Sequence, residues 1–149
     1  MPTPPPGADG PSNPAPAAVA LDEVLQAAEF RRLLRRFLAH GDVRVRRAGL
    51  TPQRYLLLLA VKGAPDRSQT RSIGQLTDDL QLAQSSVTEL VDRAEAAGLV
   101  ARSAGNADAR TVLVRLRPAG EERLAAALLA IRAEREQLLE RLDRARHHL

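Results

Sequence analysis

Five polar side chains between residues 84 and 89 have the chemistry to contact the edges of DNA bases. Apolar residues recur at helical spacing within and after this group, so the polar residues would share the exposed face of one helix. Gln can pair with adenine through two hydrogen bonds, Ser and Thr can bond to any base or phosphate, and Glu can accept from cytosine. We therefore predict that bases are read by Gln84, Ser85, Ser86, Thr88 and Glu89. An ordinary solvated helix face is the alternative.

Several cationic groups near these residues could bind the phosphate backbone, which sets the register of a protein on DNA but not its sequence preference. The candidates are Arg71, Arg93 and Arg102, together with the helix N-terminus at Ser72, where free N–H groups attract anions. Arg110 could enter the narrow minor groove. Two residues earlier, Asp108 could hold and aim its guanidinium through a charge-assisted bond.

Residues 72 to 116 supply the elements that would position these side chains. Ser72 and Gln75 form a capping box, which predicts the start of a helix. Only residues 81–83 separate this helix from the next (84–97), and so short a turn forces two helices to cross steeply. Gly98 suits a left-handed helix end. Apolar segments 99–102 and 111–116 flank a polar loop and predict a hairpin, so the unit is expected to be a winged helix-turn-helix.

Three motifs follow one another in this unit. They are Ser85-Ser86-Val87-Thr88-x-Leu90-Val91-Asp92-Arg93, then Gly98-Leu99-Val100-x-Arg102, then Asp108-x-Arg110 with Val114-x-Leu116-x-Pro118-x-Gly120. In this order they resemble the MarR family of bacterial transcriptional regulators, over about residues 50 to 120 by motif and 20 to 149 by helix layout. The resemblance implies a mainly α-helical (α+β) fold and a recognition helix in the major groove. It also implies a wing that uses the pair Asp108 and Arg110, and a dimer made by the first and last helices.

The rest of the chain is predicted to form a tail and three more helices. Residues 1–18 hold seven of the ten prolines and are expected to be a disordered tail, which leaves residues 19–149 as one domain. A helix is expected from residue 21 to 38, with Gly41 ending it. A largely buried helix should begin at Thr51-Pro52 and stop at Gly63. One continuous helix is expected from Pro118 to the C-terminus.

The predicted last helix carries an apolar stripe that needs a partner. Its members are Leu124, Leu128, Ile131, Leu138, Leu142, Ala145 and Leu149. The first helix can cover only part of this stripe, so we predict a homodimer in which residues 19–40 and 118–149 are the dimerisation helices. A single intramolecular bundle is the alternative. A two-fold dimer would bind double-stranded DNA at two half-sites about one helical turn apart.

The composition limits the possible functions. There are 22 basic and 18 acidic residues, and residues 31–71 alone carry a net charge of +9, as expected of a nucleic-acid binder. The chain has no Cys, which excludes disulfides and thiolate metal sites. No apolar run reaches the ~20 residues of a membrane span and no signal peptide is visible, so we expect a cytoplasmic protein. No catalytic, metal or cofactor motif is visible, so we expect no enzyme.

The family resemblance also implies a small effector, often aromatic and anionic, bound between the dimer helices and the winged helix. Phe37, His40, Arg47 and Tyr55 are candidates to line such a site. The sequence therefore predicts a dimeric repressor that binds a pseudo-palindromic operator and is released by an effector. The alternative is a winged-helix protein-interaction or ligand-binding module without specific DNA binding. The acidic residues of the recognition helix, Glu89 among them, favour that alternative.

Overall fold

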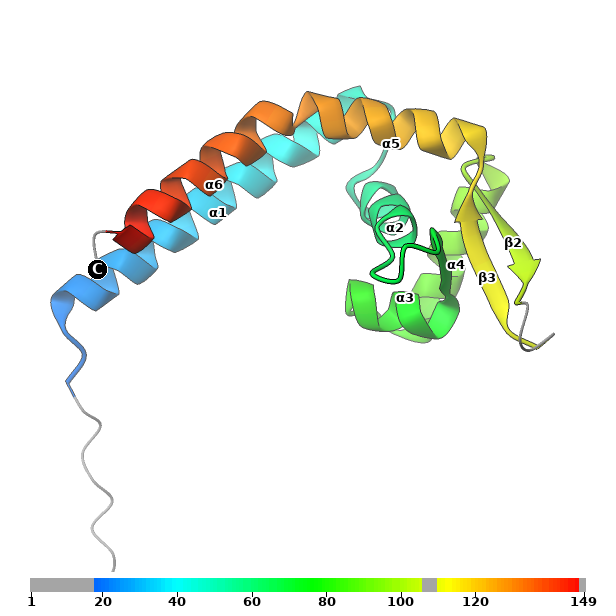
Figure 1. Ribbon diagram of the computed structural model, residues 1–149, viewed down its shortest axis with the longest axis horizontal. Coiled ribbons are helices and arrows are strands. Elements are labelled where there is room, and N and C mark those ends of the chain that lie inside the picture. Colours follow the sequence, from blue (N-terminus) through cyan, green and yellow to red (C-terminus); the bar gives the residue numbers. More distant parts are fainter. Residues whose placement is uncertain (1–17, 106–109, 148–149) are drawn as a thin grey trace, which may run out of the picture.

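A computed structural model describes residues 18–105 and 110–147. The predicted tail (1–18) falls almost wholly outside these ranges. The elements are α1 (Leu21–Arg47), α2 (Pro52–Lys62), β1 (Thr70–Ser72), α3 (Ile73–Leu80), α4 (Gln84–Ala96), β2 (Val100–Ala104), β3 (Val112–Leu116), α5 (Pro118–Ala130) and α6 (Arg132–His147). The strands form one antiparallel sheet in the order β1-β3-β2. This mainly helical fold with a small sheet confirms the predicted winged helix-turn-helix (Figure 1).

The hydrophobic core lies where α2, α3 and α4 meet the sheet (Figure 1). Its largest fully buried side chains are Val45, Leu57, Leu58, Val61, Leu76, Val87, Val91, Val100 and Val114. Their positions follow the apolar spacing of each element, because every helix turns one stripe inward. The core therefore holds the helix-turn-helix and the hairpin together as one body.

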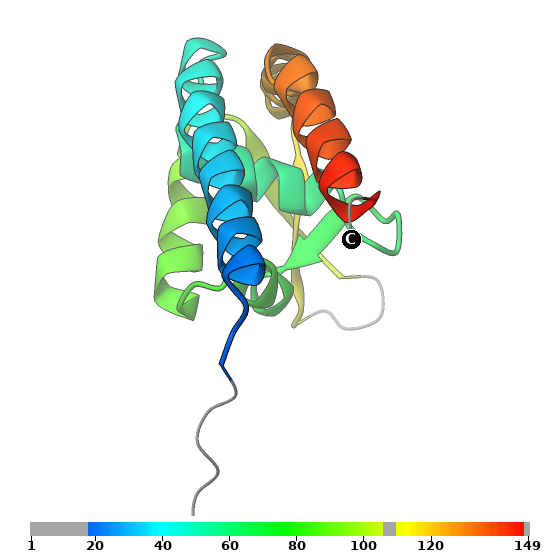
Figure 2. The same cartoon turned by 90° about the vertical axis from the view of Figure 1, so that its left-hand side faces the viewer.

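Helices α1 and α6 lie side by side and form an arm that extends from this body (Figures 1 and 2). An ion pair between Arg44 and Glu134 links the two helices. Large apolar side chains on the arm stay exposed, among them Leu21, Leu25 and Leu139. The arm consequently has apolar surface that residues 18–105 and 110–147 leave exposed.

The prediction that Gly41 ends the first helix is wrong, because α1 continues to Arg47. Gly41 lies inside the helix, whereas Gly49 has the left-handed φ of 86° just after its end. Burial explains the extension: Val45 is only 2% exposed and needs this last part of α1 to reach the core. A glycine permits a helix end but does not require one.

The prediction of one continuous C-terminal helix is also wrong. The helix breaks at Ile131, which has φ −105° and ψ 3° and separates α5 from α6. Ile131 is 4% exposed, so its side chain packs inward where the chain changes direction. The strand β1 was not predicted either, because its three residues pair only with the distant strand β3.

Candidate nucleic-acid interface

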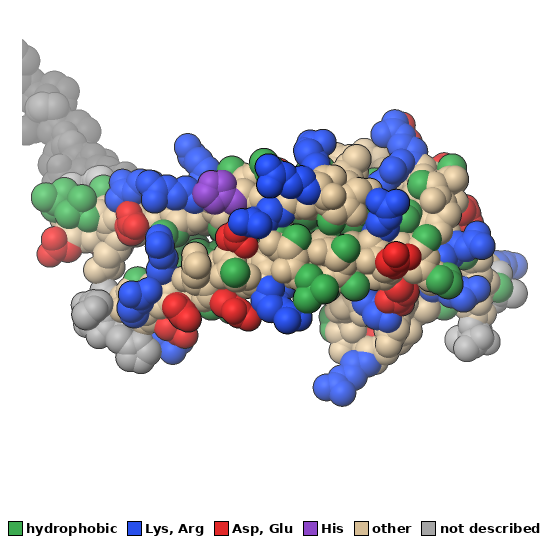
Figure 3. All heavy atoms as spheres, turned by 90° about the horizontal axis from the view of Figure 1, so that it is seen from above, with side chains coloured by type: hydrophobic (Ala, Val, Ile, Leu, Met, Phe, Trp, Pro, Cys, Tyr) green, Lys and Arg blue, Asp and Glu red, His purple; other side chains and the backbone are tan. Residues whose placement is uncertain are grey.

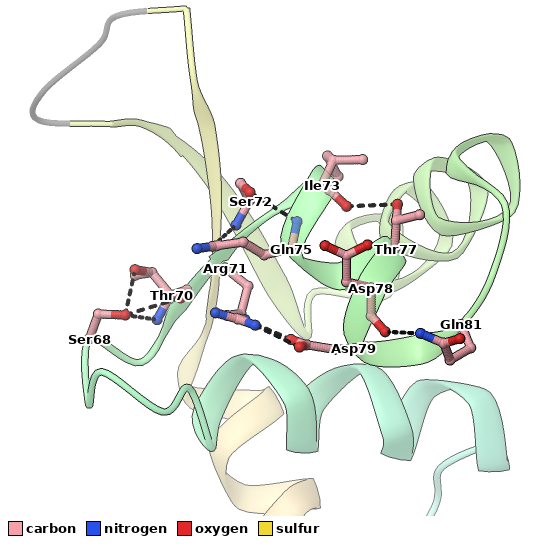
Figure 4. A network of polar contacts seen from close by, with 10 residues as sticks. All are labelled: Ser68, Thr70, Arg71, Ser72, Ile73, Gln75, Thr77, Asp78, Asp79 and Gln81. Carbon is pink, nitrogen blue, oxygen red and sulfur yellow. Dashed lines mark hydrogen bonds and ion pairs between the residues drawn. The ribbon is translucent and has the colours of Figure 1, made fainter.

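The turn between α3 and α4 has the predicted length and geometry. Ser72 Oγ accepts a hydrogen bond from the Gln75 backbone at 3.1 Å, and the Gln75 side chain accepts one from the Ser72 N–H at 2.9 Å, which confirms the capping box (Figure 4). Gln81 then adopts a left-handed conformation with φ 54°. Helix α4 starts three residues later at Gln84, and its N-cap, Ala83, offers no side-chain acceptor. The first N–H groups of α4 are consequently left without a capping side chain.

Helix α4 has one buried and one exposed face. Val87, Leu90, Val91 and Ala94 pack into the core. The predicted base readers Gln84, Ser85, Ser86 and Glu89 are exposed. Thr88 is half-buried, and its hydroxyl donates to the Gln84 carbonyl at 2.9 Å. The first two turns of α4 therefore present a short polar surface on a rigid support, with Thr88 at its edge.

One residue of this surface was missed from the sequence. Gln53, in the first turn of α2, lines a polar pocket together with Ser86, Glu89 and Arg93. Its amide can serve the same hydrogen bonds as Gln84. Nothing in the spacing along the chain brings residue 53 next to residue 89, because the contact depends on how α2 packs against α4. We add Gln53 to the candidate DNA-contacting residues.

The two most exposed charges of α4 pair with each other. The Arg93 guanidinium donates to the Glu89 carboxylate one turn earlier, and about three-fifths of each side chain is exposed. Such a pair at i,i+4 is weak and can open when another charge approaches. The predicted roles of Arg93 at phosphate and of Glu89 at a base therefore stay predictions, with this weak pair in competition.

Arg71 is held more firmly than a free phosphate ligand would be. Its Nε and NH2 groups donate to the two oxygens of Asp79, each at 2.6 Å, so that β1 is tied to α3 (Figure 4). The hydrogen bond to Asp79 is the main cause that raises the pKa of Arg71 above its ordinary value. Its side chain is only 12% exposed. The predicted role of Arg71 at phosphate stays a prediction, with this contact in competition.

Arg102 also has acidic partners within the protein. It donates to both Asp92 and Glu95 of α4 from its place on β2. Burial lowers the pKa of Arg102, but hydrogen bonds to the two carboxylates outweigh burial, so the pKa lies above its ordinary value. The two acids of the second half of α4 are therefore turned toward the wing.

The wing is a two-stranded hairpin at the edge of the sheet. Strands β2 and β3 pair from Val100 opposite Leu116 to Ala104 opposite Val112, and the Gly105 N–H donates to the Thr111 carbonyl at 2.8 Å. Arg110 is exposed beyond the last pair. Asp108 lies outside the described residues, so its predicted contact with Arg110 stays a prediction.

A separate apolar cavity of about 340 Å³ lies where α1, α2 and the junction of α5 with α6 meet. Phe37 and Tyr55 line it as predicted, whereas His40 lines a different groove between α1 and α6, and Arg47 lines neither. The sequence missed Arg135 and the exposed side chains Leu56 and Leu59, which also line the cavity. We expected α2 to be buried on most sides, and these two leucines correct that prediction.

The polar groups of this cavity are few. Burial raises the pKa of the Tyr55 hydroxyl, and the nearby Arg135 guanidinium partly offsets this rise. Tyr55 therefore stays protonated at neutral pH and can donate a hydrogen bond. The carboxylate of Asp42 also lines the cavity, so its polar groups are one hydroxyl donor, one cation and one anion in an otherwise apolar lining.

Neither a metal site nor a membrane-spanning helix occurs among the described residues. Within residues 18–105 and 110–147, no cluster of three or more His, Asp or Glu side chains could hold a metal ion. No helix in these ranges is both long enough and apolar enough to cross a bilayer.

Comparison with known proteins agrees with the geometry. Residues 48–111 match the family model described as the MarR family. No curated protein sequence matches the chain.

Three solved structures illustrate the similarity. A MarR family transcriptional regulator from Streptomyces coelicolor, in complex with DNA, has a TM-score of 0.67 and 22% identity over 85% of this chain and 78% of that one. The transcriptional regulator BldR from Sulfolobus solfataricus has a TM-score of 0.61 and 26% identity over 89% of this chain and 100% of that one. BpsR from Bordetella bronchiseptica, whose DNA binding is regulated by 6-hydroxynicotinic acid, has a TM-score of 0.58 and 22% identity over 75% of this chain and 82% of that one.

Proposed function

We propose that this chain is a DNA-binding transcriptional regulator of the MarR family that acts as a homodimeric repressor at a pseudo-palindromic operator. The observation that carries the proposal is the short polar surface on the first two turns of α4. This surface is exposed, stands on four buried apolar residues and lies next to a wing that ends in the exposed Arg110. A rigid helix with free polar side chains at its start is what entry into the major groove requires.

The second part of the proposal is the homodimer. Leu21 is 71% exposed, Leu129 is 60% exposed and Leu139 is 55% exposed, all of them on the helices that form or continue the arm. Seen from above, apolar side chains surface between the charged ones along this face (Figure 3). Exposed apolar surface of this kind marks an interface, and a second copy is the simplest partner because it brings two recognition helices to one duplex.

The third part is an effector in the cavity of α1, α2 and the α5–α6 junction. Its apolar lining, the Tyr55 hydroxyl and the Arg135 guanidinium suit a small aromatic anion whose acidic group pairs with Arg135 and points away from Asp42, which also lines the cavity. In BpsR, an aromatic acid of this kind, 6-hydroxynicotinic acid, regulates DNA binding. The cavity adjoins both the arm and α2, so a ligand there could change how the two recognition helices of a dimer are spaced.

The alternative is a winged-helix protein-interaction or ligand-binding module without specific DNA binding. The argument for it is that the acidic residues of α4 would repel the phosphates of DNA. Within α4, Glu89 pairs with Arg93, and Asp92 and Glu95 both pair with Arg102. These acids therefore repel phosphate less than their number suggests, and DNA binding is the better supported function.

Substitution of a base reader tests the proposal. Gln84→Ala should weaken binding to the operator by about 1–3 kcal/mol and leave binding to a scrambled duplex unchanged, because only base contacts depend on sequence. Glu122→Ala is the control, since Glu122 is an exposed polar residue on α5 that lies outside both α4 and the arm. Equal losses on both duplexes would show that Gln84 does not read bases.

A further inference from the structure

Arg102 of β2 forms ion pairs with two acidic residues of α4. The Arg102 guanidinium bridges two carboxylates, Asp92 and Glu95, which lie three residues apart on α4. The backbone N–H of Arg102 also donates to Glu95 Oε1 at 3.3 Å. One residue of β2 is therefore joined to the recognition helix by both its side chain and its backbone.

The guanidinium already has two carboxylate partners that a phosphate would have to displace. NH1 and NH2 each bind a carboxylate, and the side chain is only 26% exposed. An Arg that reaches phosphate would have to break two charge-assisted bonds, which are among the stronger hydrogen bonds in proteins. Asp92, at 60% exposed, and Glu95, at 40% exposed, would then be left unpaired beside the DNA.

We propose that Arg102 is a positioning residue that locks the wing against the recognition helix, and that Asp92 and Glu95 therefore raise DNA affinity although they are negatively charged. We call Arg102, Asp92 and Glu95 the wing clamp. The inference rests on the proposed function, because it concerns the orientation of Arg110 relative to α4 on the same DNA. It replaces the predicted phosphate contact of Arg102 with an indirect role.

The wing clamp and simple charge repulsion predict opposite changes in DNA affinity when Asp92 and Glu95 are neutralised. If Asp92 and Glu95 only repelled phosphate, their neutralisation would tighten DNA binding and steepen its salt dependence through a freed Arg102. If they hold the wing, the same neutralisation loosens β2 and β3 and misplaces Arg110. Affinity for the operator should then fall, although the protein has become more positive.

The first readout needs no DNA. Hydrogen–deuterium exchange is measured on the full-length protein and on Asp92→Asn/Glu95→Gln. The proposal predicts faster exchange in β2 and β3 and unchanged exchange in α2, with Glu89→Gln as the control because Glu89 pairs with Arg93 and not with the wing. Unchanged exchange in both wing strands would overturn the wing clamp, whatever the protein does with DNA.

The second readout is binding to a labelled duplex from directly upstream of the protein's own gene. Asp92→Asn/Glu95→Gln should lose roughly tenfold in affinity, whereas Glu122→Gln, which neutralises an exposed acid on α5 outside α4 and the wing, should not. In an Arg110→Ala background the same double substitution should have little further effect, because the wing contact is already lost. Tighter binding, or a full tenfold loss without Arg110, would overturn the proposal. If the wild-type protein does not prefer this duplex, the proposed function fails, and the exchange measurement still decides on the wing clamp.

Discussion

Gly120 of α5 lies directly against the backbone carbonyl of Leu99. A Cβ added at position 120 would be 2.1 Å from the Leu99 oxygen, and the same oxygen accepts a hydrogen bond from the Arg117 N–H at 2.9 Å. The start of α5 is thus docked onto the segment between α4 and β2. Because α5 leads into the arm, this contact connects the DNA-binding body to the proposed dimerisation helices.

Gly120→Ala should destabilise the protein by about 1–3 kcal/mol, because the new methyl group meets backbone that cannot rotate away. The free energy of unfolding from urea titration measures the loss. Gly41→Ala is the matched control: no atom lies within 4 Å of its added Cβ and the site is inside a helix, so it should gain about 0.5–1 kcal/mol. Equal effects of the two substitutions would contradict the close approach of Gly120 to Leu99.

The bidentate pair of Arg71 with Asp79 should contribute to stability rather than to DNA affinity. We expect Arg71→Ala to cost about 1–2 kcal/mol, more than an exposed ion pair, because the Arg71 side chain is only 12% exposed. Asp79→Asn should cost a similar amount, and the double variant little more than either one. Urea titrations of the three variants provide the check. Unchanged stability in Arg71→Ala, combined with weaker DNA binding, would instead favour the predicted phosphate contact.

The tyrosine absorbance of this protein reports on the cavity alone, because Tyr55 is the only tyrosine in the chain and the chain has no Trp. Burial raises its pKa above 10.0, so the folded state prefers the neutral phenol. The contribution of the neutral Tyr55 phenol to the free energy of unfolding is therefore complete below the pKa of the unfolded chain. It is lost as the pH rises through the higher pKa of the folded protein. An absorbance titration of tyrosinate should have its midpoint above that of the urea-unfolded protein. Arg135→Gln should raise the midpoint further, since Arg135 lowers this pKa, and a lower midpoint would contradict the geometry.

The proposed dimer predicts that polar substitutions on the arm weaken self-association. Leu139→Ser removes an apolar side chain that is 55% exposed on α6, and should raise the dimer dissociation constant by roughly tenfold or more, as losses at interface anchors do. Val112→Ser, on β3 and 40% exposed, is the matched control and should leave the constant unchanged. Sedimentation equilibrium measures both variants. A wild-type protein that remains monomeric at micromolar concentration would refute the dimer.

Local signals in the sequence predicted the local structure well. The capping box at Ser72, the N-cap at Thr51 and the left-handed Gly98, with φ 73°, all depend on neighbours a few residues away, and all three are confirmed. The three-residue turn before Gln84 and the hairpin are confirmed for the same reason. These features could be derived because short-range geometry determines them.

The errors have long-range causes. The helix through Gly41 continues because Val45 must reach the core, and the helix break at Ile131 accompanies the burial of its side chain. The partners of Arg102 and the position of Gln53 beside α4 likewise depend on packing between distant segments. Spacing along the chain carries no information about these contacts. For that reason the structure altered the predicted site more than it altered the predicted fold.

Sequence-specific DNA binding is tested most directly by the fluorescence anisotropy of the wild-type protein with two labelled duplexes. One duplex comes from directly upstream of the protein's own gene, and the other is a scrambled version of the same length and composition. We predict tighter binding to the first by a factor on the order of 10³ at physiological salt, with two chains bound per duplex. Equal, weak and strongly salt-dependent binding to both duplexes would contradict the proposed function, because such binding needs only the basic charge of the chain.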